Sequence, residues 1–119
     1  MYFRQEIGKW GESLACKYLE TNNYKVIERN FLCRQGEIDI IAEDSLKKEL
    51  VFIEVKTRSN LKYGNPIDAV NRQKQKHMVY AIKYYIYKKG IKDIPIRIDV
   101  IEIHMQERNY KVNHIKQVI

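Results

Sequence analysis

The chain has 119 residues, of which 45% are hydrophobic, and this size suits one folded domain spanning residues 1–119. Its 22 Lys and Arg outnumber 15 Asp and Glu, and the net charge of +7 favours an anionic partner, nucleic acid above all. A basic surface without a specific ligand is the alternative. No run of about 18 apolar residues is present, so we expect no transmembrane helix and no membrane partner.

The N-terminus and the cysteines predict a cytoplasmic protein. The opening residues, MYFRQEIGKWGE, soon become charged and lack the apolar core of a secretory signal. Cys16 and Cys33 are the only cysteines, and they do not have CxxC spacing. We therefore expect reduced thiols, and neither a disulfide framework nor a zinc site.

Hydrophobic periodicity predicts a mixed α/β domain in one piece. Residues 4–22 form a first amphipathic helix, because apolar residues recur there at spacings of three and four. Runs rich in β-branched residues, bounded by turn residues, predict strands, and Pro66 suits the first turn of a second helix. The expected elements are strands at residues 24–32, 37–42 and 50–58, a helix at residues 65–88, and strands at residues 94–103 and 110–118.

Charged residues interrupt two strands that should be buried. Asp39 lies in the segment EIDIIA, and Glu54 and Lys56 lie in LVFIEVK. A hairpin that folds between Leu46 and Lys47 places Asp39 opposite Glu54. Opposed side chains have Cβ atoms roughly 4.5–5.5 Å apart, and like charges at that distance repel. Such a pair persists only if a cation lies between the carboxylates or if one carboxyl keeps its proton.

The residue types in this group predict a site for a hard divalent ion. Carboxylate oxygens favour Mg²⁺ or Mn²⁺ over zinc, and no histidine belongs to the group. Lys56 shares a face with Glu54 and can orient a water or neutralise a phosphate, an arrangement typical of phosphodiester cleavage. The alternative is that Lys56 only forms a salt bridge with Glu54 or Asp39 at a solvated sheet edge. Glu12, at the edge of the first helix, is a candidate third carboxylate, and Glu37 is a fourth.

The second helix predicts contacts with phosphate. Lys74 lies in the centre of the apolar stripe that includes Val70 and Met78, so it either extends to solvent or reaches the charged face of the sheet. Basic and aromatic residues alternate on the outer faces, which suits phosphate contact and base stacking, although a solvated face is the default for any one of them. They are Arg72, Lys76, Lys83, Lys88 and Lys89 with Tyr80, Tyr84 and Tyr87.

The remaining charged residues predict structural roles. Arg97 and Asp99 share one face of the fourth strand, where we expect a structural salt bridge. The histidines, His77, His104 and His114, are scattered along the chain. We expect them to be surface or packing residues and not metal ligands.

Several motifs together resemble the signature of the YraN-like bacterial family. They are Gly11-Glu12-x-x-Ala15-x-x-Tyr18-Leu19, Gly36-Glu37-Ile38-Asp39, VFIEVKTR at residues 51–58, Gly64-x-Pro66-x-x-Ala69-Val70-x-x-x-Lys74 and Arg97-x-Asp99-Val100. The resemblance covers roughly residues 8–103. This family is regarded as predicted endonucleases of the PD-(D/E)XK superfamily, similar to archaeal Holliday junction resolvases. The resemblance implies a restriction-endonuclease-like αβββαβ core, with a mixed central sheet flanked by helices.

The resemblance also implies an activity and a set of roles. The superfamily motif corresponds to Asp39 and Glu54-Val55-Lys56, with Ile38 where the motif name has proline. It implies Mg²⁺- or Mn²⁺-dependent hydrolysis of DNA, with branched or flapped DNA as candidate substrates and a homodimer as the expected assembly. Asp39, Glu54 and Glu12 would hold the metal, and Lys56 would orient the attacking water. The candidate nucleic-acid-binding residues are Lys74, Arg58, Arg72 and Lys76.

Two other classes of function stay open at this stage. One is a non-catalytic nucleic-acid-binding module that retains the nuclease fold. The other is an adaptor within a DNA-processing complex. The intact set of Asp39, Glu54 and Lys56 favours the enzyme, because a protein without catalysis has no need to keep two carboxylates that repel each other.

Overall fold

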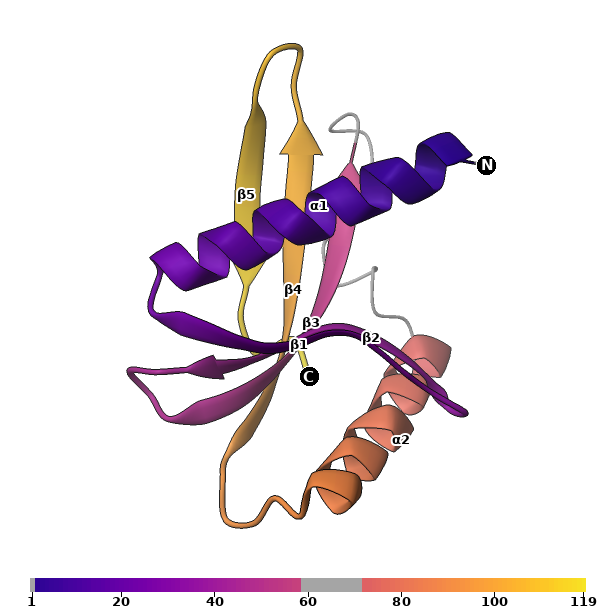
Figure 1. Ribbon diagram of the computed structural model, residues 1–119, viewed down its shortest axis with the longest axis vertical. Helices are drawn as coiled ribbons and strands as arrows, with labels where there is room; N and C mark the ends of the chain where they lie inside the picture. Colours follow the sequence, from indigo (N-terminus) through magenta and orange to yellow (C-terminus); the bar gives the residue numbers. More distant parts are fainter. Residues whose placement is uncertain (1, 59–71) are drawn as a thin grey trace.

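The structure of the protein, a computed structural model, describes residues 2–58 and 72–119, with side chains described for residues 8–58 and 73–119. Its elements are α1 (Tyr2–Thr21), β1 (Tyr24–Cys33), β2 (Gly36–Asp44), β3 (Glu49–Arg58), α2 (Arg72–Lys89), β4 (Ile96–Met105) and β5 (Tyr110–Ile115). This order is the predicted αβββαβ core followed by one more strand (Figure 1). The expected start of the second helix at Asn65 and Pro66 lies outside the described residues.

The strands form one mixed sheet in the order β1-β2-β3-β4-β5. All neighbours pair antiparallel except β3 and β4, which are parallel and are connected through α2. Within the hairpin of β2 and β3, Ile40 pairs with Ile53 and Ala42 pairs with Val51. This register is the one predicted from a fold between Leu46 and Lys47.

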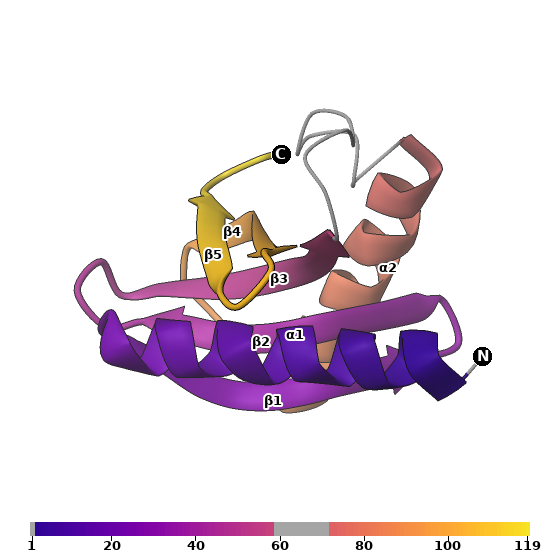
Figure 2. The ribbon, with the colours of Figure 1, turned by 90° about the horizontal axis from the view of Figure 1, so that it is seen from above.

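The two helices lie on opposite sides of the sheet (Figure 2). Buried residues of α1, such as Leu19, pack with Val51, Ile53 and their neighbours on one face. On the other face, Met78 and Tyr85 of α2 pack with a separate cluster that includes Phe52. The alternation along β3 therefore directs odd-numbered residues toward α1 and even-numbered residues toward α2, as the pattern predicts.

The sheet opens where β2 leaves β3. Their ladder ends at the pair of Ile40 and Ile53, whereas β2 continues to pair with β1 as far as Gly36. In β1, Asn30 adopts a left-handed backbone conformation with φ of 52°, which asparagine tolerates better than most residues. Figure 1 shows the hairpin of β1 and β2 leaving the direction of β3 and β4. We call this opening the fork; Asp39 and Glu54 lie at its apex.

Two expectations from composition can be compared with the described residues. Cys16 and Cys33 are both free thiols, as predicted. Neither α1 nor the described part of α2 is long and apolar enough to cross a membrane.

Candidate active site

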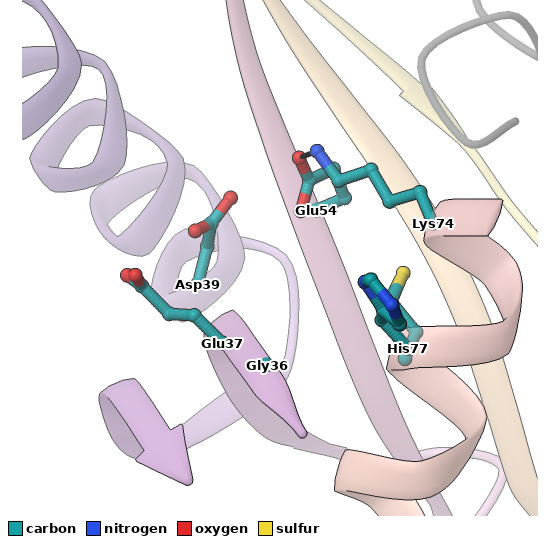
Figure 3. Close-up of a pocket in the computed structure, with 7 residues that line it drawn as sticks. Gly36, Glu37, Asp39, Glu54, Lys74 and His77 are labelled. Atoms are coloured by element: carbon teal, nitrogen blue, oxygen red, sulfur yellow. Dashed lines mark hydrogen bonds and ion pairs between the residues drawn. The ribbon is translucent and has the colours of Figure 1, made fainter. Parts of the chain in front are cut away.

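A pocket of about 230 Å³ lies at the fork and is bounded by β2, β3 and α2 (Figure 3). Its lining residues are Gly36, Glu37, Asp39, Glu54, Lys74, His77 and Met78. Four of the predicted candidates, Glu37, Asp39, Glu54 and Lys74, therefore meet in one place, from three different elements. Figure 3 shows Glu54 and Lys74 pointing toward each other across it.

Glu54 is the most deeply buried carboxylate of the pocket, with 5% of its surface exposed. Its Oε1 accepts a hydrogen bond from Lys74 Nζ and lies 3.5 Å from Lys56 Nζ. Lys74 thus reaches the charged face of the sheet, one of the two predicted alternatives. The salt bridge of Lys56 to Glu54 is also present, but it is made to a buried carboxylate and not at a solvated edge.

The two lysines differ in their tendency to carry a charge. Burial and the neighbouring Lys74 ammonium lower the pKa of Lys56 below its ordinary value. Burial also acts against the charge on Lys74, but the hydrogen bond to Glu54 and its negative charge raise the pKa of Lys74 above the ordinary value. Lys74 is therefore the fixed cation of the pair, and Lys56 is the lysine that loses its proton more readily.

Asp39 lies beside Glu54, and few contacts stabilise its ionised form. Its Oδ2 accepts a hydrogen bond of 2.9 Å from the backbone N–H of Val55. Burial, together with the negative charge of Glu54, raises the pKa of Asp39 to about 8. One of the two carboxyls therefore keeps its proton when no further cation is bound, which is one of the two outcomes expected for opposed carboxylates.

Glu12 is held next to this pair by the packing of α1 on β3. The helix approaches the strand so closely at Gly11 that a Cβ there would overlap Thr57 Oγ1. Arg29 Nη2 lies 4.0 Å from Glu12 Oε1, and that buried oxygen accepts no hydrogen bond from the part of the chain that the structure describes. Burial raises the pKa of Glu12, with the charges of Glu37 and Glu54 acting in the same direction.

The carboxylates of the site suit a hard divalent ion as ligands, although their oxygen atoms do not surround one point. Among the described residues, no three Asp, Glu, His or Cys side chains are grouped closely enough to hold a metal ion. Asp39, Glu54 and Glu12 nevertheless supply only carboxylate oxygens, the ligands that Mg²⁺ and Mn²⁺ prefer. The raised pKa values of Asp39 and Glu12 both indicate that added positive charge would stabilise the group.

Arg58 and Lys76, two of the other candidate nucleic-acid-binding residues, are not among the residues that line this pocket. Arg58 Nε lies 3.8 Å from Glu102 Oε2, so the arginine belongs to the β3–β4 contact. Lys76 is exposed and lines a separate hollow with Lys83 on the far side of α2. The side chain of Arg72 lies outside the described residues. Of the four candidates, only Lys74 is placed at the carboxylates by the structure.

Among the titratable residues that line the pocket, His77 is the one for which the sequence predicted no site role. It is exposed, in agreement with the prediction, but it also lines the pocket with Asp39 and Glu54. Its position three residues after Lys74 would have placed it near the same end of the helix face. The pairing of Arg29 with Glu12 was also missed, since nothing in the pattern of β1 indicates which side of the sheet Arg29 faces.

A second buried group of charges surrounds Arg97. Its Nε lies 2.9 Å from Asp99 Oδ1, which confirms the predicted salt bridge. The guanidinium also bonds Asp44, Glu49 and the hydroxyl of Tyr24. His114 Nε2 lies 2.7 Å from Asp99 Oδ2, so His114 packs inside this group. His104 packs elsewhere, with its Nε2 3.0 Å from Glu102 Oε1.

Comparison with known proteins gives the family. Residues 11–103 match the model described as "Uncharacterised protein family UPF0102". The chain belongs to the UPF0102 family. This confirms the YraN-like resemblance at the level of the family.

Individual UPF0102 relatives match along nearly their whole length. One from Clostridioides difficile (strain 630) is 41% identical over 111 residues, which cover 93% of this chain and 94% of the relative. One from Clostridium botulinum (strain Alaska E43 / Type E3) is 44% identical over 117 residues, covering 96% and 93%. Among solved structures, Pyrococcus furiosus SfsA in complex with Ca²⁺ aligns with 95% of this chain and 63% of its own, at 14% identity and a TM-score of 0.38. That similarity is too low to support an argument about this UPF0102 protein.

Proposed function

We propose that this UPF0102 protein is a metal-dependent endonuclease of the PD-(D/E)XK type that hydrolyses phosphodiester bonds in DNA at the fork. One observation carries the proposal: Asp39 and Glu54 are held together in a pocket where the pKa of Asp39 is raised to about 8, and two lysines point at the same carboxylate. Perturbed carboxylates beside lysines in a pocket are typical of active sites. The net charge of +7 fits a nucleic-acid substrate.

Each residue of the proposed active site has a role that its environment suits. Asp39 and Glu54 would hold Mg²⁺ or Mn²⁺ together with Glu12, and the ion would supply positive charge at the phosphate and acidify a water. Lys56 Nζ, with its lowered pKa, orients the attacking water and can accept its proton. Lys74, the fixed cation, exchanges Glu54 for a phosphate oxygen of the substrate and stabilises the charge that develops there.

A non-catalytic nucleic-acid-binding module is the second candidate. The pairing of Glu54 with both Lys56 and Lys74 favours it, because a carboxylate neutralised by lysines can persist without a metal. The raised pKa of Asp39 counts against it, since within the described part of the chain no lysine forms an ion pair with that carboxyl. Both candidates predict DNA binding, so only cleavage separates them.

The test is a cleavage assay on linear, flapped and four-way DNAs with Mg²⁺, Mn²⁺ or EDTA. We expect the wild type to cleave with metal, and Glu54→Gln to abolish cleavage. DNA binding by Glu54→Gln should be unchanged or tighter, because the substitution releases Lys56 and Lys74 from their ion pairs. The matched control is Glu20→Gln, an equal change of charge at an exposed position of α1.

Two results would contradict the proposal. If the wild type binds these DNAs but cleaves none of them with either metal, the protein is a binding module. If Glu54→Gln cleaves as fast as Glu20→Gln, the fork is not the active site. Thermal unfolding of both variants checks that loss of cleavage does not come from loss of the fold.

A further inference from the structure

The side of α2 that faces away from the sheet carries lysines and tyrosines in alternation. Lys76, Tyr80, Lys83 and Tyr87 follow one another at steps of four, three and four residues, so they lie in one line along the helix. We call this line the Lys–Tyr stripe. Tyr87 is 85% exposed and Tyr80 is 46% exposed, whereas Tyr85 on the opposite side of the helix is buried against the sheet.

The charge around the stripe is of one sign. The segment Arg72–Lys89 contains no Asp or Glu. Among the described residues, Lys76 and Lys83 form no ion pair. The acidic side chains that act on this helix do so away from the stripe, since Glu54 and Asp39 act on Lys74 and Glu28 acts on the buried Tyr85. The stripe is therefore complementary in charge to an anionic ligand.

The stripe also offers surfaces for flat groups. A hollow of about 390 Å³ lies beside it, within the size range of small-ligand sites, and is lined by Gln75, Lys76, Val79, Tyr80, Lys83 and Ile119. The exposed rings of Tyr80 and Tyr87 supply flat surfaces of their own, and Lys88 Nζ, 5.9 Å from the centre of the Tyr84 ring, is an instance of a cation over a ring on the same helix. An unpaired base presents the same kind of flat surface to a ring.

We propose that the Lys–Tyr stripe binds single-stranded nucleic acid, with backbone phosphates at Lys76 and Lys83 and unpaired bases stacked on Tyr80 and Tyr87. Positive charge combined with aromatic stacking is the general mode of single-strand binding. The eleven residue steps from Lys76 to Tyr87 span about 16 Å of helix, which corresponds to about five stacked nucleotides at roughly 3.4 Å each. One short strand can therefore contact both lysines and both rings.

Other anionic ligands use only part of this surface. A duplex covers the faces of its bases, so the tyrosines would add nothing to its binding. A membrane requires an apolar helix face to insert, and the apolar face of α2, with Met78 and Tyr85, is packed against the sheet. An acidic protein would pair with the lysines but would not stack on the rings. The stripe faces away from the fork, so the proposal does not depend on cleavage there.

The test measures binding of a fluorescein-labelled dT12 strand and of a 12-base-pair duplex by anisotropy, in EDTA. We expect Tyr80→Ala/Tyr87→Ala to weaken binding of the strand about tenfold for each ring and to leave duplex binding unchanged. Tyr80→Phe/Tyr87→Phe keeps the rings and should bind the strand as the wild type does. Lys76→Ala/Lys83→Ala should lower the salt dependence, the slope of log K against log[salt], by about 1.4 for the strand.

The matched control is Lys17→Ala/Lys47→Ala, which removes two exposed lysines elsewhere. Equal losses for the control and for Lys76→Ala/Lys83→Ala would overturn the proposal, because the effect would then be that of net charge. Equal losses of strand and duplex binding by the alanine variant of the tyrosines would also overturn it, as would an unchanged affinity for the strand. If the wild type binds phosphatidylserine vesicles but not dT12, the stripe is a membrane contact and the proposal is wrong.

Discussion

Two buried groups of charges on the same sheet have similar residues but opposite electrostatics. The Arg97 cluster comprises Arg97 with Asp44, Glu49, Asp99 and Tyr24. Although burial favours the neutral acid, hydrogen bonds from His114 and Arg97 keep the pKa of Asp99 below its ordinary value. The pKa of Asp44 is lowered in the same way, by backbone N–H groups and Arg97. Asp44 and Asp99 are therefore stabilised in their charged forms by the fold itself.

The fork cluster comprises Glu12, Asp39, Glu54, Lys56 and Lys74. Here the fold does not stabilise Asp39 and Glu12 in their charged forms. The pKa of Asp39 is raised to about 8 and that of Glu12 is raised as well, both chiefly by burial. Glu12 Oε1 has no hydrogen-bond partner among the described residues. The two clusters thus differ in the outcome of burial: partners in the fold keep Asp44 and Asp99 charged, whereas at the fork burial favours the neutral forms of Asp39 and Glu12, a property typical of functional sites.

The largest effect on stability is expected at the Arg97 cluster. Arg97→Met would leave Asp44 and Asp99 buried without their cation and should lower the free energy of unfolding by about 3–5 kcal/mol, measured by urea denaturation. Lys56→Met should cost no more than about 1 kcal/mol, because Lys74 still neutralises Glu54 and Lys56 is partly exposed. Similar losses for the two variants would show that the clusters do not differ in this way.

Much of the fork could be predicted from the sequence because its parts are local. The short charged loop between two apolar runs determines the hairpin register, and the register places Asp39 and Glu54 together. Lys74 was identified because it interrupts an apolar stripe at helical spacing. Each of these inferences needs only the side-chain periodicity of one helix or strand, or the length of one turn.

The rest could not be predicted because it depends on how distant elements meet. Arg97 bonds Asp44 and Glu49 only because β4 pairs parallel to β3, a register that no short loop determines. The same pairing of β3 with β4 places the side chain of Arg58 against Glu102 of β4, and so outside the pocket. These contacts follow from twist and long-range pairing, which a single sequence does not show.

Metal binding should stabilise the fork cluster and not the Arg97 cluster. At a concentration of Mg²⁺ or Mn²⁺ about 100 times its dissociation constant, the wild type should gain about 2.7 kcal/mol by mass action, seen as a rise in Tm. Asp39→Asn should gain little, because it removes a ligand. Asp44→Asn, the matched change in the Arg97 cluster, should respond to metal as the wild type does. A loss of response in Asp44→Asn but not in Asp39→Asn would place the metal at the other cluster.

The pH dependence of stability without metal should differ in sign between the clusters. The folded protein keeps a proton on Asp39 up to pH about 8, whereas the unfolded chain loses it near 3.8. The contribution of Asp39 is therefore fully present below the unfolded pKa, and it is lost as the pH rises toward 8, by up to about 1.4 kcal/mol per pH unit. The contribution of Asp99, whose pKa is lowered, is present above its unfolded value and is lost in acid.

Asp39→Asn isolates the first of these contributions. The variant retains an oxygen that can accept the hydrogen bond from Val55 but does not titrate, so its stability relative to wild type should rise between pH 5 and pH 8. Urea denaturation at several pH values in EDTA measures this difference. If the difference between the two proteins is constant over this range, Asp39 is already ionised in the folded state and the fork carboxylates do not repel as inferred.

The smallest expected effect separates the two possible partners of Lys74, the carboxylate and a phosphate. Lys74→Ala should lower the slope of log K against log[salt] for duplex DNA by about one, as expected for one phosphate contact, without changing sequence preference. The control Lys17→Ala removes an exposed lysine from α1 and should leave the slope unchanged. An unchanged slope in Lys74→Ala would mean that the ammonium stays with Glu54 when DNA binds. Lys74 would then belong to the internal pairing of the fork, as Arg97 belongs to its own cluster, and not to the binding surface.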